Sequence, residues 1–506
     1  MTTKRKSTKP HRRTANAPEN SFVAGGFAPA PEDASILRLD TKPRRLLIGG
    51  KWVAGASTRE TINPATGEPI ATFAIAGPKQ VDAAVAAARR AYEGEWSALP
   101  AAERGKLLFR LARLLQERSR EFAVLESLDG GKPIRESRDI DIPLAAAHIF
   151  HHAGWADKLD YAAPGRRPRP LGVAAQIIPW NFPLLMAAWK LAPALATGNT
   201  VVLKPAETTP LTALLLGQLI EEAGFPPGVV NILTGAGQTG ATLAAHPGVD
   251  KIAFTGSTAV GKAIQRALAG SQKRYTLELG GKAAHILFED CAIDQAVEGI
   301  INGIFFNQGH VCCAGSRLFV QEGIADTVIR KLKRRIETLV VGDPLDKNTD
   351  IGAINSPEQL ERIQELVAAG KAEGAECWQG PQTLPRRGCW FAPTLFTGCS
   401  QSHRIVREEI FGPVLAIQTF RTPAEAIEKA NNTPFGLSGG VWTDKGAKIF
   451  KVTGALRAGV IWANTFNKFD PSSPFGGYKE SGIGREGGLH GLHAYLDLHH
   501  QSPTMS

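Results

Sequence analysis

Two adjacent cysteines, Cys312 and Cys313, lie between glycines in the segment Gly-His-Val-Cys-Cys-Ala-Gly. A helical pattern precedes this segment and a strand pattern follows it, so we expect a loop, where reactive side chains are often placed. A cysteine there acts as a nucleophile if its thiolate is favoured and accessible. Taken alone, the segment fits two small buried side chains equally well. A metal site that includes His310 is disfavoured because adjacent cysteines lack the usual ligand spacing, and we expect no metal.

A carboxylate, Glu278, stands inside the apolar run Leu-Glu-Leu-Gly-Gly-Lys at residues 277–282. Burying a carboxylate in an apolar strand costs free energy unless the group is paired or functional. Burial also raises its pKa, which suits a general base. The alternative is a structural carboxylate that accepts hydrogen bonds from backbone amides at the end of the strand.

Three further segments follow apolar strands and carry polar side chains. Asn181, held between two prolines, is a rigid amide donor that suits a developing oxyanion, although a simple turn also explains it. Ser257 follows a strand and a glycine and begins a helix, which makes an anion site or only a helix cap, and Thr258 breaks the usual G-x-G-x-x-G pattern. Lys204 and Glu207 are placed to hold a ribose, or else they lie in a solvated loop.

The elements that must position these residues alternate between strand and helix. Apolar, non-alternating strands separated by helices predict an α/β fold with a doubly wound parallel sheet, whose ligands bind at the carboxyl ends of the strands. A second strand–helix series begins near residue 290. The expected strands are 172–178, 200–203, 229–233, 252–254, 275–279 and 284–288, and the expected helices between them are 184–197, 211–223 and 259–269. Residues 436–440 match the nucleophile elbow G-x-S-x-G, but a strand pattern follows instead of a helix, which disfavours a serine hydrolase.

The charge of the chain is unevenly spread. Of the net charge of +10, the first 45 residues carry +6, from ten Lys and Arg and four acids. Prolines and glycines in this segment argue against a stable helix, so we expect a disordered arm. The simplest interpretation is a solvated tail; binding of an acidic partner and a role in targeting are alternatives. No motif in the rest of the chain predicts nucleic-acid binding.

The cysteines and the hydropathy pattern bear on the cellular compartment in which the protein works. The chain has 506 residues and six cysteines, none in a C-x-x-C pair. No apolar run is long enough for a membrane span and the N-terminus has no apolar signal core. Together these features favour a reducing compartment, and we expect a cytoplasmic protein that does not bind a membrane.

Taken together, the segments resemble the aldehyde dehydrogenase superfamily over roughly residues 45–497. Long motifs occur in the order typical of that family. They are Pro-Trp-Asn at 179–181, Leu-Lys-Pro-Ala-Glu at 203–207, Phe-Thr-Gly-Ser at 254–257, Leu-Glu-Leu-Gly-Gly-Lys at 277–282, Asn-Gln-Gly-x-x-Cys at 307–312, Glu-Glu-Ile-Phe-Gly-Pro at 408–413 and Pro-Phe-Gly-Gly-Tyr-Lys at 474–479.

The resemblance implies the role of each residue. Cys312 would attack the aldehyde, Asn181 and the Cys312 backbone amide would form the oxyanion hole, and Glu278 would activate the water that hydrolyses the thioester. Lys190 and Glu486 fit a proton relay. The cofactor-binding residues would be Ile177, Pro179, Trp180, Lys204, Glu207, Gly237, Phe254, Gly256, Ser257, Gly280, Glu409 and Phe411. The substrate pocket would be lined by Phe182, Met186, Trp189, Val311, Cys313, Phe469 and Phe475, which suits an apolar or aromatic aldehyde.

The same resemblance implies the reaction and the cofactor. A thiohemiacetal on Cys312 would pass hydride to the nicotinamide, and the resulting thioester would be hydrolysed. Glu278 favours this hydrolytic class over members that transfer the acyl group to phosphate or coenzyme A. Glu207 favours NAD, with NADP as the alternative, because a carboxylate repels a 2′-phosphate. The competing hypothesis is a scaffold subunit on the same fold. His310, which stands where many relatives have Gln, is expected to influence the nearby thiol without being catalytic.

The resemblance also divides the chain. Two doubly wound open-sheet domains and a small β oligomerisation arm are expected. The assignments are a basic disordered arm at 1–44, an NAD-binding domain at 45–150 and 171–281, a catalytic domain at 282–484, and an oligomerisation segment at 151–170 and 485–506. The short C-terminus lacks the usual strand sequence, which favours a homodimer over a tetramer.

Overall fold

The computed structural model describes residues 30–37 and 42–499. By its contacts the chain divides after Ala30, and Pro31–Ser506 form one compact unit. Of the arm predicted at 1–44, residues 1–29 and 38–41 lie outside the described residues. Among the others, Glu32 forms ion pairs with Arg120 and Lys347, and the backbone of Arg44 bonds to β4.

The first sheet contains eight strands in the order β2-β1-β8-β7-β6-β9-β10-β20. Its five central strands, β8 to β10, run parallel, and antiparallel strands lie at both edges. The bounds are β1 (Leu46–Ile48), β2 (Lys51–Val53), β6 (Val173–Ile177), β7 (Thr200–Lys204), β8 (Val230–Ile232), β9 (Lys251–Thr255), β10 (Arg274–Glu278) and β20 (Gly482–Ile483). A separate hairpin joins β3 (Ser57–Ile62) and β4 (Pro69–Ile75).

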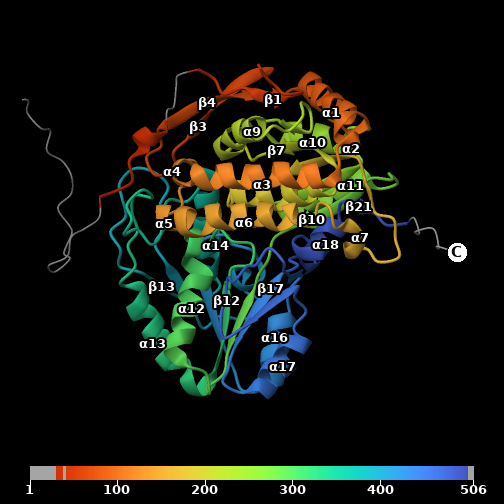
Figure 1. Cartoon of the computed structure of the whole chain (residues 1–506). Coiled ribbons are helices and arrows are strands. Elements are labelled where there is room, and N and C mark those ends of the chain that lie inside the picture. Colours follow the sequence, from red (N-terminus) through yellow and green to blue (C-terminus); the bar gives the residue numbers. More distant parts are fainter. Residues whose placement is uncertain (1–29, 38–41, 500–506) are drawn as a thin grey trace, which may run out of the picture. The chain divides into compact units, whose positions relative to one another are not determined.

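Helices cover both faces of this sheet, and this explains why its strands are apolar throughout. Val201 and Leu203 of β7 enter one core, whereas Val202 between them enters the core on the opposite face. A parallel strand with two covered faces has no solvent side on which to place polar residues. The helices on the first face include α3 (Ala101–Glu117), α4 (Ser119–Gly130), α6 (Ile142–Ala153), α8 (Pro183–Ala196) and α9 (Leu211–Ala223). Those on the second are α1 (Pro78–Glu93), α10 (Gly237–Ala245) and α11 (Thr258–Leu268), and Figure 1 shows α3 and α6 side by side.

The second sheet contains seven strands in the order β13-β14-β15-β12-β11-β17-β18, parallel except for the edge strand β13. The strand bounds are β11 (Ala284–Leu287), β12 (Arg317–Gln321), β13 (Glu376–Gln379), β14 (Thr394–Thr397), β15 (Val414–Phe420), β17 (Ser438–Trp442) and β18 (Val460–Ala463). Its helices are α12 (Ile293–Phe305), α13 (Ala325–Ile336), α14 (Pro357–Ala372), α15 (Arg404–Arg407), α16 (Pro423–Asn431) and α17 (Gly446–Ala455). The two expected strand–helix series are thus confirmed as two open sheets, whereas α10, α14 and α17 were not predicted.

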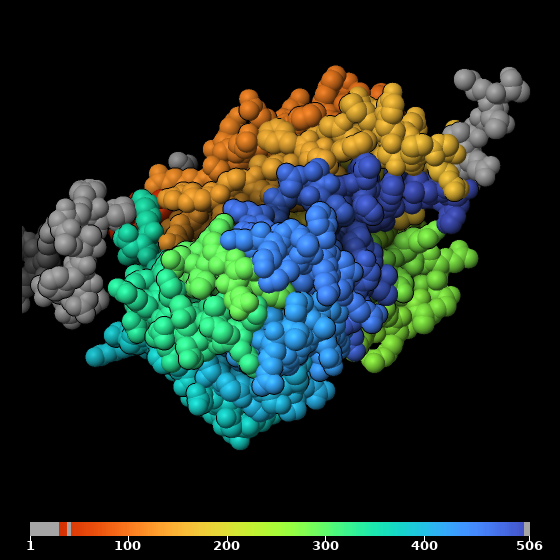
Figure 2. Space-filling view, turned by 90° about the horizontal axis from the view of Figure 1, so that it is seen from below, coloured from red at the N-terminus to blue at the C-terminus, as the bar shows by residue number. Residues whose placement is uncertain are grey.

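The C-terminal segment returns to the first sheet. β20, which lies within the catalytic segment predicted at 282–484, pairs with β10, with Gly482 opposite Glu278. Further along, β21 (Leu496–Asp497) pairs antiparallel with β5 (Arg169–Pro170). The two stretches predicted to form the oligomerisation segment therefore meet, and Figure 2 shows the dark blue C-terminal part against the gold segment. Remaining short elements are η1 (Ala34–Ile36), α2 (Glu95–Ala98), α5 (Ile134–Glu136), η2 (Ser137–Asp141), α7 (Leu159–Ala162), η3 (Phe306–Gly309), η4 (Glu322–Ile324), β16 (Phe435–Gly436), β19 (Tyr478–Lys479) and α18 (Gly488–His493).

No helix among the described residues is long and apolar enough to cross a membrane.

Candidate active site

The nucleophile loop, residues 306–315, follows α12 and contains the two cysteines. Asn307 and Gln308 adopt left-handed backbone conformations, with φ of 48° and 54°. Such values are costly for residues other than glycine and persist only where the surroundings enforce them. The loop lies directly against the end of β10, because a Cβ on Gly281 would come within 2.3 Å of the Cys312 carbonyl oxygen. Only glycine permits this approach between the two segments.

Asn181 is locked to the nucleophile loop by reciprocal side-chain bonds. Its Nδ2 donates to the carbonyl of His310 at 2.7 Å, and Nδ2 of Asn307 donates to the carbonyl of Asn181 at 2.8 Å. Each bond is buried, which strengthens it relative to water. The side-chain amide of Asn181 is thus held rigidly near Cys312, and its second N–H can donate to an oxyanion.

Glu278 stands at the end of β10 and is 4% exposed. Within the described residues, neither of its carboxylate oxygens has a hydrogen-bond partner. Burial raises its pKa well above the usual range, the nearby Glu486 carboxylate raises it further, and the Lys190 ammonium opposes both. A buried, unpartnered carboxyl group with a raised pKa fits a general base.

Lys190 and Glu486 form a buried ion pair behind Glu278. Lys190 donates to Glu486 and, at 2.7 Å, to the hydroxyl of Thr255. The backbone of Glu486 pairs in both directions with Phe475, a predicted pocket residue. The two residues predicted from sequence as a relay are therefore in direct contact, and Thr255 is a further partner of Lys190 that the sequence did not single out.

The Cys312 thiol is neutral in these surroundings. Its contact with the Cys313 thiol raises its pKa, and burial raises it further, well above the ordinary value. A thiol in this state needs a nearby base or a positive charge before it can attack. Cys313 is buried, and its thiol lies 3.7 Å from the side-chain oxygen of Asn467.

His310 does not influence the thiol through charge. Its ring is buried, and burial lowers its pKa to about 3, so the imidazole is neutral. The ring packs edge-on against Trp180, with centroids 4.8 Å apart, and stacks near Phe411. Its role in the loop is packing, together with the carbonyl that accepts from Asn181.

The predicted pocket residues meet in one cavity of about 410 Å³. Trp189, Phe469 and Phe475 form an aromatic cluster with ring centroids 5.5 to 6.2 Å apart. The seven residues that line the cavity as predicted are Phe182, Met186, Trp189, Val311, Cys313, Phe469 and Phe475, and Phe306 and Asn302 join them. The exposed Lys468 lies at the same cavity.

The predicted cofactor residues follow the carboxyl ends of the first sheet. Ile177 lies beside Lys204 and Phe254 in neighbouring strands, and the Lys204 ammonium is 3.7 Å from the Glu207 carboxylate. Seven line the cavity that contains Cys312: Pro179, Trp180, Gly256, Ser257, Gly280, Glu409 and Phe411. Five lie outside its lining: Ile177, Lys204, Glu207, Gly237 and Phe254.

These residues fit a dinucleotide. Ser257 caps α11, and its hydroxyl accepts from the Val260 N–H, so the first turn presents amide groups to an anion. Glu207 follows β7, which β6 separates from β9, at the carboxyl ends of the strands, where a ribose would bind. The same cavity extends from the start of α11 to Cys312. A dinucleotide bound by its diphosphate at the helix could therefore place its nicotinamide ring beside the thiol.

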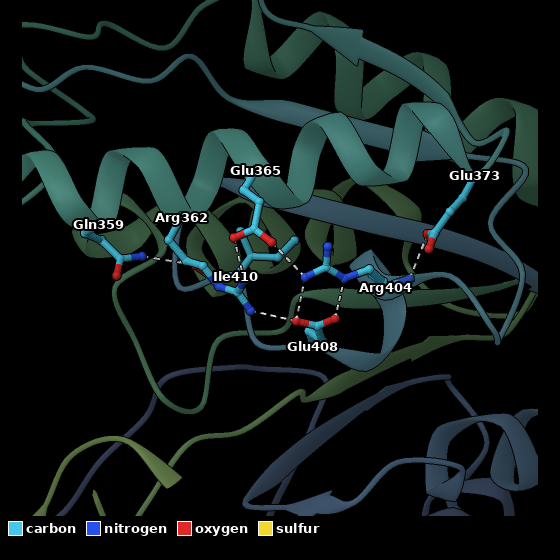
Figure 3. A network of polar contacts seen from close by, with 7 residues as sticks. All are labelled: Gln359, Arg362, Glu365, Glu373, Arg404, Glu408 and Ile410. Carbon is cyan, nitrogen blue, oxygen red and sulfur yellow. Dashed lines mark hydrogen bonds and ion pairs between the residues drawn. The ribbon is translucent and has the colours of Figure 1, made fainter. Parts of the chain in front are cut away.

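The segment Glu408–Phe411 contributes Glu409, Ile410 and Phe411 to the wall of the cavity that contains Cys312. Glu409 accepts from the Gly281 N–H at 2.9 Å, and burial raises its pKa to about 7. Phe411 has a φ of 56°, another enforced left-handed residue. Nε2 of Gln359, on α14, donates to the carbonyl of Ile410 (Figure 3) and to that of Phe411.

An ion-pair network supports this segment from outside. Glu408 accepts from Arg362 and Arg404 at 2.6 Å each, and Glu365 bridges the same two arginines (Figure 3). The bond from Arg404 holds the pKa of Glu408 below its usual value. Gln359 and Arg362 were not among the predicted site residues, because α14 lies about fifty residues before this segment and was not predicted.

We expect Glu408→Gln to weaken cofactor binding without affecting chemistry. Partly exposed ion pairs contribute about 0.5–1 kcal/mol, so KM for the cofactor should rise by about two- to fivefold while kcat changes little. Initial rates over a cofactor series measure both. Glu365→Gln is the matched control, because Glu365 binds the same arginines but is not joined to Glu409. An equal rise in KM for both variants would contradict the prediction.

A crevice at the carboxyl ends of parallel strands that opens onto an activatable thiol defines a nucleotide-dependent enzyme that works through a cysteine. The comparisons with known proteins specify which one. The profile of the aldehyde dehydrogenase family matches residues 52–500. Human retinal dehydrogenase 2 is 47% identical over 475 residues, covering 91% of this chain and 92% of that protein.

Solved structures agree. The NAD+ complex of an aldehyde dehydrogenase from Bacillus cereus has a TM-score of 0.87 and 42% identity, covering 90% of this chain and 95% of that one. An indole-3-acetaldehyde dehydrogenase in complex with NAD+ has a TM-score of 0.87 and 41% identity, covering 91% and 96%. The chain belongs to the aldehyde dehydrogenase family, and it is an NAD(P)-dependent enzyme that oxidises aldehydes.

Proposed function

We propose that this enzyme converts an apolar or aromatic aldehyde to its carboxylic acid through a thioester on Cys312, with NAD as the preferred cofactor. The observation that carries the proposal is the convergence of Cys312, Asn181 and Glu278 on one cavity. The nicotinamide ring of bound NAD would be the hydride acceptor, and Glu409 and Phe411 would hold it. Ser257 would contact the diphosphate of NAD, and Lys204 and Glu207 would bind its adenosine ribose.

The protein's own groups account for the remaining steps. The Cys312 thiol releases its proton to solvent, which the positive charge of a bound nicotinamide would favour, and the thiolate sulfur attacks the carbonyl carbon to form a thiohemiacetal. The Asn181 amide and the Cys312 backbone N–H stabilise its oxyanion. After oxidation, Glu278 takes a proton from water, the resulting hydroxide attacks the thioester, and the acid leaves as the thiol is restored. Lys190 and Glu486 carry the proton away from Glu278.

The aromatic cluster supports the substrate class. Trp189, Phe469 and Phe475 offer ring surface on which an apolar or planar substrate gains contact area. Two relatives bear names that specify such aldehydes, retinal and indole-3-acetaldehyde. The test is NADH formation by the full chain with NAD and a panel that ranges from acetaldehyde to phenylacetaldehyde and long-chain aldehydes. The proposal requires kcat/KM to rise with apolar size; preference for short or charged aldehydes contradicts it.

We expect Glu207→Gln to relax cofactor choice. A carboxylate hydrogen bond to the ribose contributes about 1.5–3 kcal/mol, so kcat/KM with NAD should fall by roughly ten- to hundredfold. Loss of the charge should raise kcat/KM with NADP by about tenfold, because a 2′-phosphate is no longer repelled. The ratio of the two kcat/KM values is the measurement. Glu222→Gln, on the exposed side of α9, serves as the control, and an unchanged ratio in Glu207→Gln would refute the assignment.

A cytoplasmic homodimer completes the proposal. All six cysteines are free thiols, as a reducing compartment requires. The β5–β21 pair is a two-stranded sheet, and such sheets leave edges that another chain can extend. Sedimentation at several protein concentrations distinguishes a dimer from a monomer or tetramer.

A further inference from the structure

Besides Asp129, four ionisable side chains within residues 126–141 are buried beside the active site. They are Glu126 on α4, Lys132 in the following turn, Glu136 on α5 and Asp141 at the end of η2. The side chains of Glu126 and Asp141 are 0% exposed and that of Lys132 is 2% exposed. Charged residues are almost never buried to this degree unless they are paired or functional.

Lys132 is the centre of this group. Its ammonium donates to Asp141 and lies 3.8 Å from the Glu126 carboxylate. The same ammonium lies 4.1 Å from the ring centroid of Phe182, the residue after Asn181. A cation over an aromatic face is attracted by the ring, most strongly where water is excluded.

The carboxylates reach the two loops that form the proposed oxyanion hole. Glu126 accepts from the Leu184 N–H at 3.3 Å, in the first turn of α8 directly after Asn181. Glu136 accepts from the Asn307 N–H at 2.9 Å, at the start of the left-handed stretch that leads to Cys312. Each bond satisfies a buried donor that would otherwise be orphaned.

We propose that Lys132 and its carboxylates Glu126, Glu136 and Asp141 position the Asn181 turn and the nucleophile loop relative to each other. The inference rests on the roles proposed above for Asn181 and Cys312. Through Glu126 and Phe182 the cluster holds the first turn of α8, and through Glu136 it fixes the strained backbone of Asn307. Asn307 in turn bonds to the carbonyl of Asn181, so one buried cation links both donors.

The charge balance supports a single central role for Lys132. Burial raises the pKa of Glu126 and of Glu136 to about 8 each, and the charge of Lys132 opposes this rise in both. Burial also raises the pKa of Asp141, again against Lys132. Loss of this cation would therefore leave Glu126 and Asp141 without a counter-charge and Glu136 with that of Arg135 alone.

The test compares Lys132→Met with Asp129→Ala in the full-length enzyme. Asp129 lies on the same helix as Glu126, is also buried, and accepts from the Thr61 hydroxyl and from the Leu211 N–H at the start of α9. Its hydrogen-bond partners therefore lie outside the Asn181 turn and the nucleophile loop. A misplacement of about 1 Å in a reacting group costs about 10²-fold in rate. We expect Lys132→Met to lose about 10²-fold in kcat while KM for NAD stays within about threefold, whereas Asp129→Ala loses thermal stability but keeps kcat within about threefold.

A second pair of variants, at Glu136, tests the proposed positioning role if Lys132→Met does not fold. Glu136→Gln keeps an oxygen that can accept from Asn307, whereas Glu136→Leu removes it. Positioning requires that the Gln variant retain at least about tenfold more kcat than the Leu variant when both are measured well below their unfolding temperatures. Equal kcat in this pair, wild-type kcat in folded Lys132→Met, or an equal loss of kcat in Asp129→Ala would overturn the inference. Failure of the proposed function is recognised separately, since it would show as a silent wild type or an active Cys312→Ser variant.

Discussion

Cys312→Ser is expected to abolish turnover. A serine hydroxyl is a far weaker nucleophile than a thiol near neutral pH. His310 is a poor base to activate it, because burial lowers its pKa to about 3 and its ring packs against Trp180. We expect kcat to fall by at least about 10⁴-fold, which corresponds to a rise of about 5.5 kcal/mol in the barrier. NADH formation with an apolar aldehyde measures the loss.

Two controls separate loss of the nucleophile from loss of the fold. Cys312→Ser should bind NAD with wild-type affinity in calorimetry, because the cofactor crevice lies along the strand ends. Cys313→Ser, a change at the neighbouring thiol, should still form NADH, with a change in KM for the aldehyde because Cys313 lines the pocket. Turnover that survives in Cys312→Ser and disappears in Cys313→Ser would reverse the assignment of the two cysteines.

Glu278→Gln is expected to stop the enzyme after the first half of the reaction. The amide has nearly the same shape but cannot accept a proton from water, so the thioester should accumulate. We expect a burst of about one NADH per active site, followed by a steady rate roughly 10²–10⁴-fold below that of the wild type. Rapid-mixing absorbance measures the burst and the slow phase together. Hydroxylamine, which attacks thioesters directly, should restore turnover.

The pH dependence provides an independent check on the same residue. Burial, with the Glu486 charge, raises the pKa of Glu278, and a general base works only when it is deprotonated. The deacylation rate of the wild type should therefore rise with pH through this raised pKa and level off above it. In Glu278→Gln this limb should vanish. A variant that shows no burst, or that keeps the wild-type pH profile, would place the base elsewhere.

The buried acids also affect stability. Burial raises the folded-state pKa of Asp129 to about 7 and those of Glu126 and Glu136 to about 8, well above their unfolded values near 4. Folding therefore takes up protons, and the contribution of these groups to stability is largest below their unfolded pKa values and declines as the pH rises through 8.

Local patterns in the sequence were sufficient to identify the two sheets and the main reacting groups. Buried parallel strands such as β6 and β7 are apolar on both faces, so strand, helix and turn could be recognised from neighbouring residues alone. Helix α9 was predicted at its observed bounds, because Gly224 ends it in a left-handed conformation. The short motifs around Cys312, Glu278 and Asn181 each lie within one loop or strand end, and for that reason the resemblance could place them.

Only the tertiary structure decided how distant segments combine. Three sets of contacts join residues from separate parts of the chain: those of the Lys132 cluster with Phe182, Leu184 and Asn307, the Gln359 bonds to Ile410 and Phe411, and the pairing of β20 with β10. Nothing in the sequence near Lys132 distinguishes it from a solvated lysine, since its surroundings include the ring of Phe182, fifty residues further along the chain. Hydrogen bonds and desolvation act between atoms that are close in space, and for these groups that proximity arises only after the chain has folded.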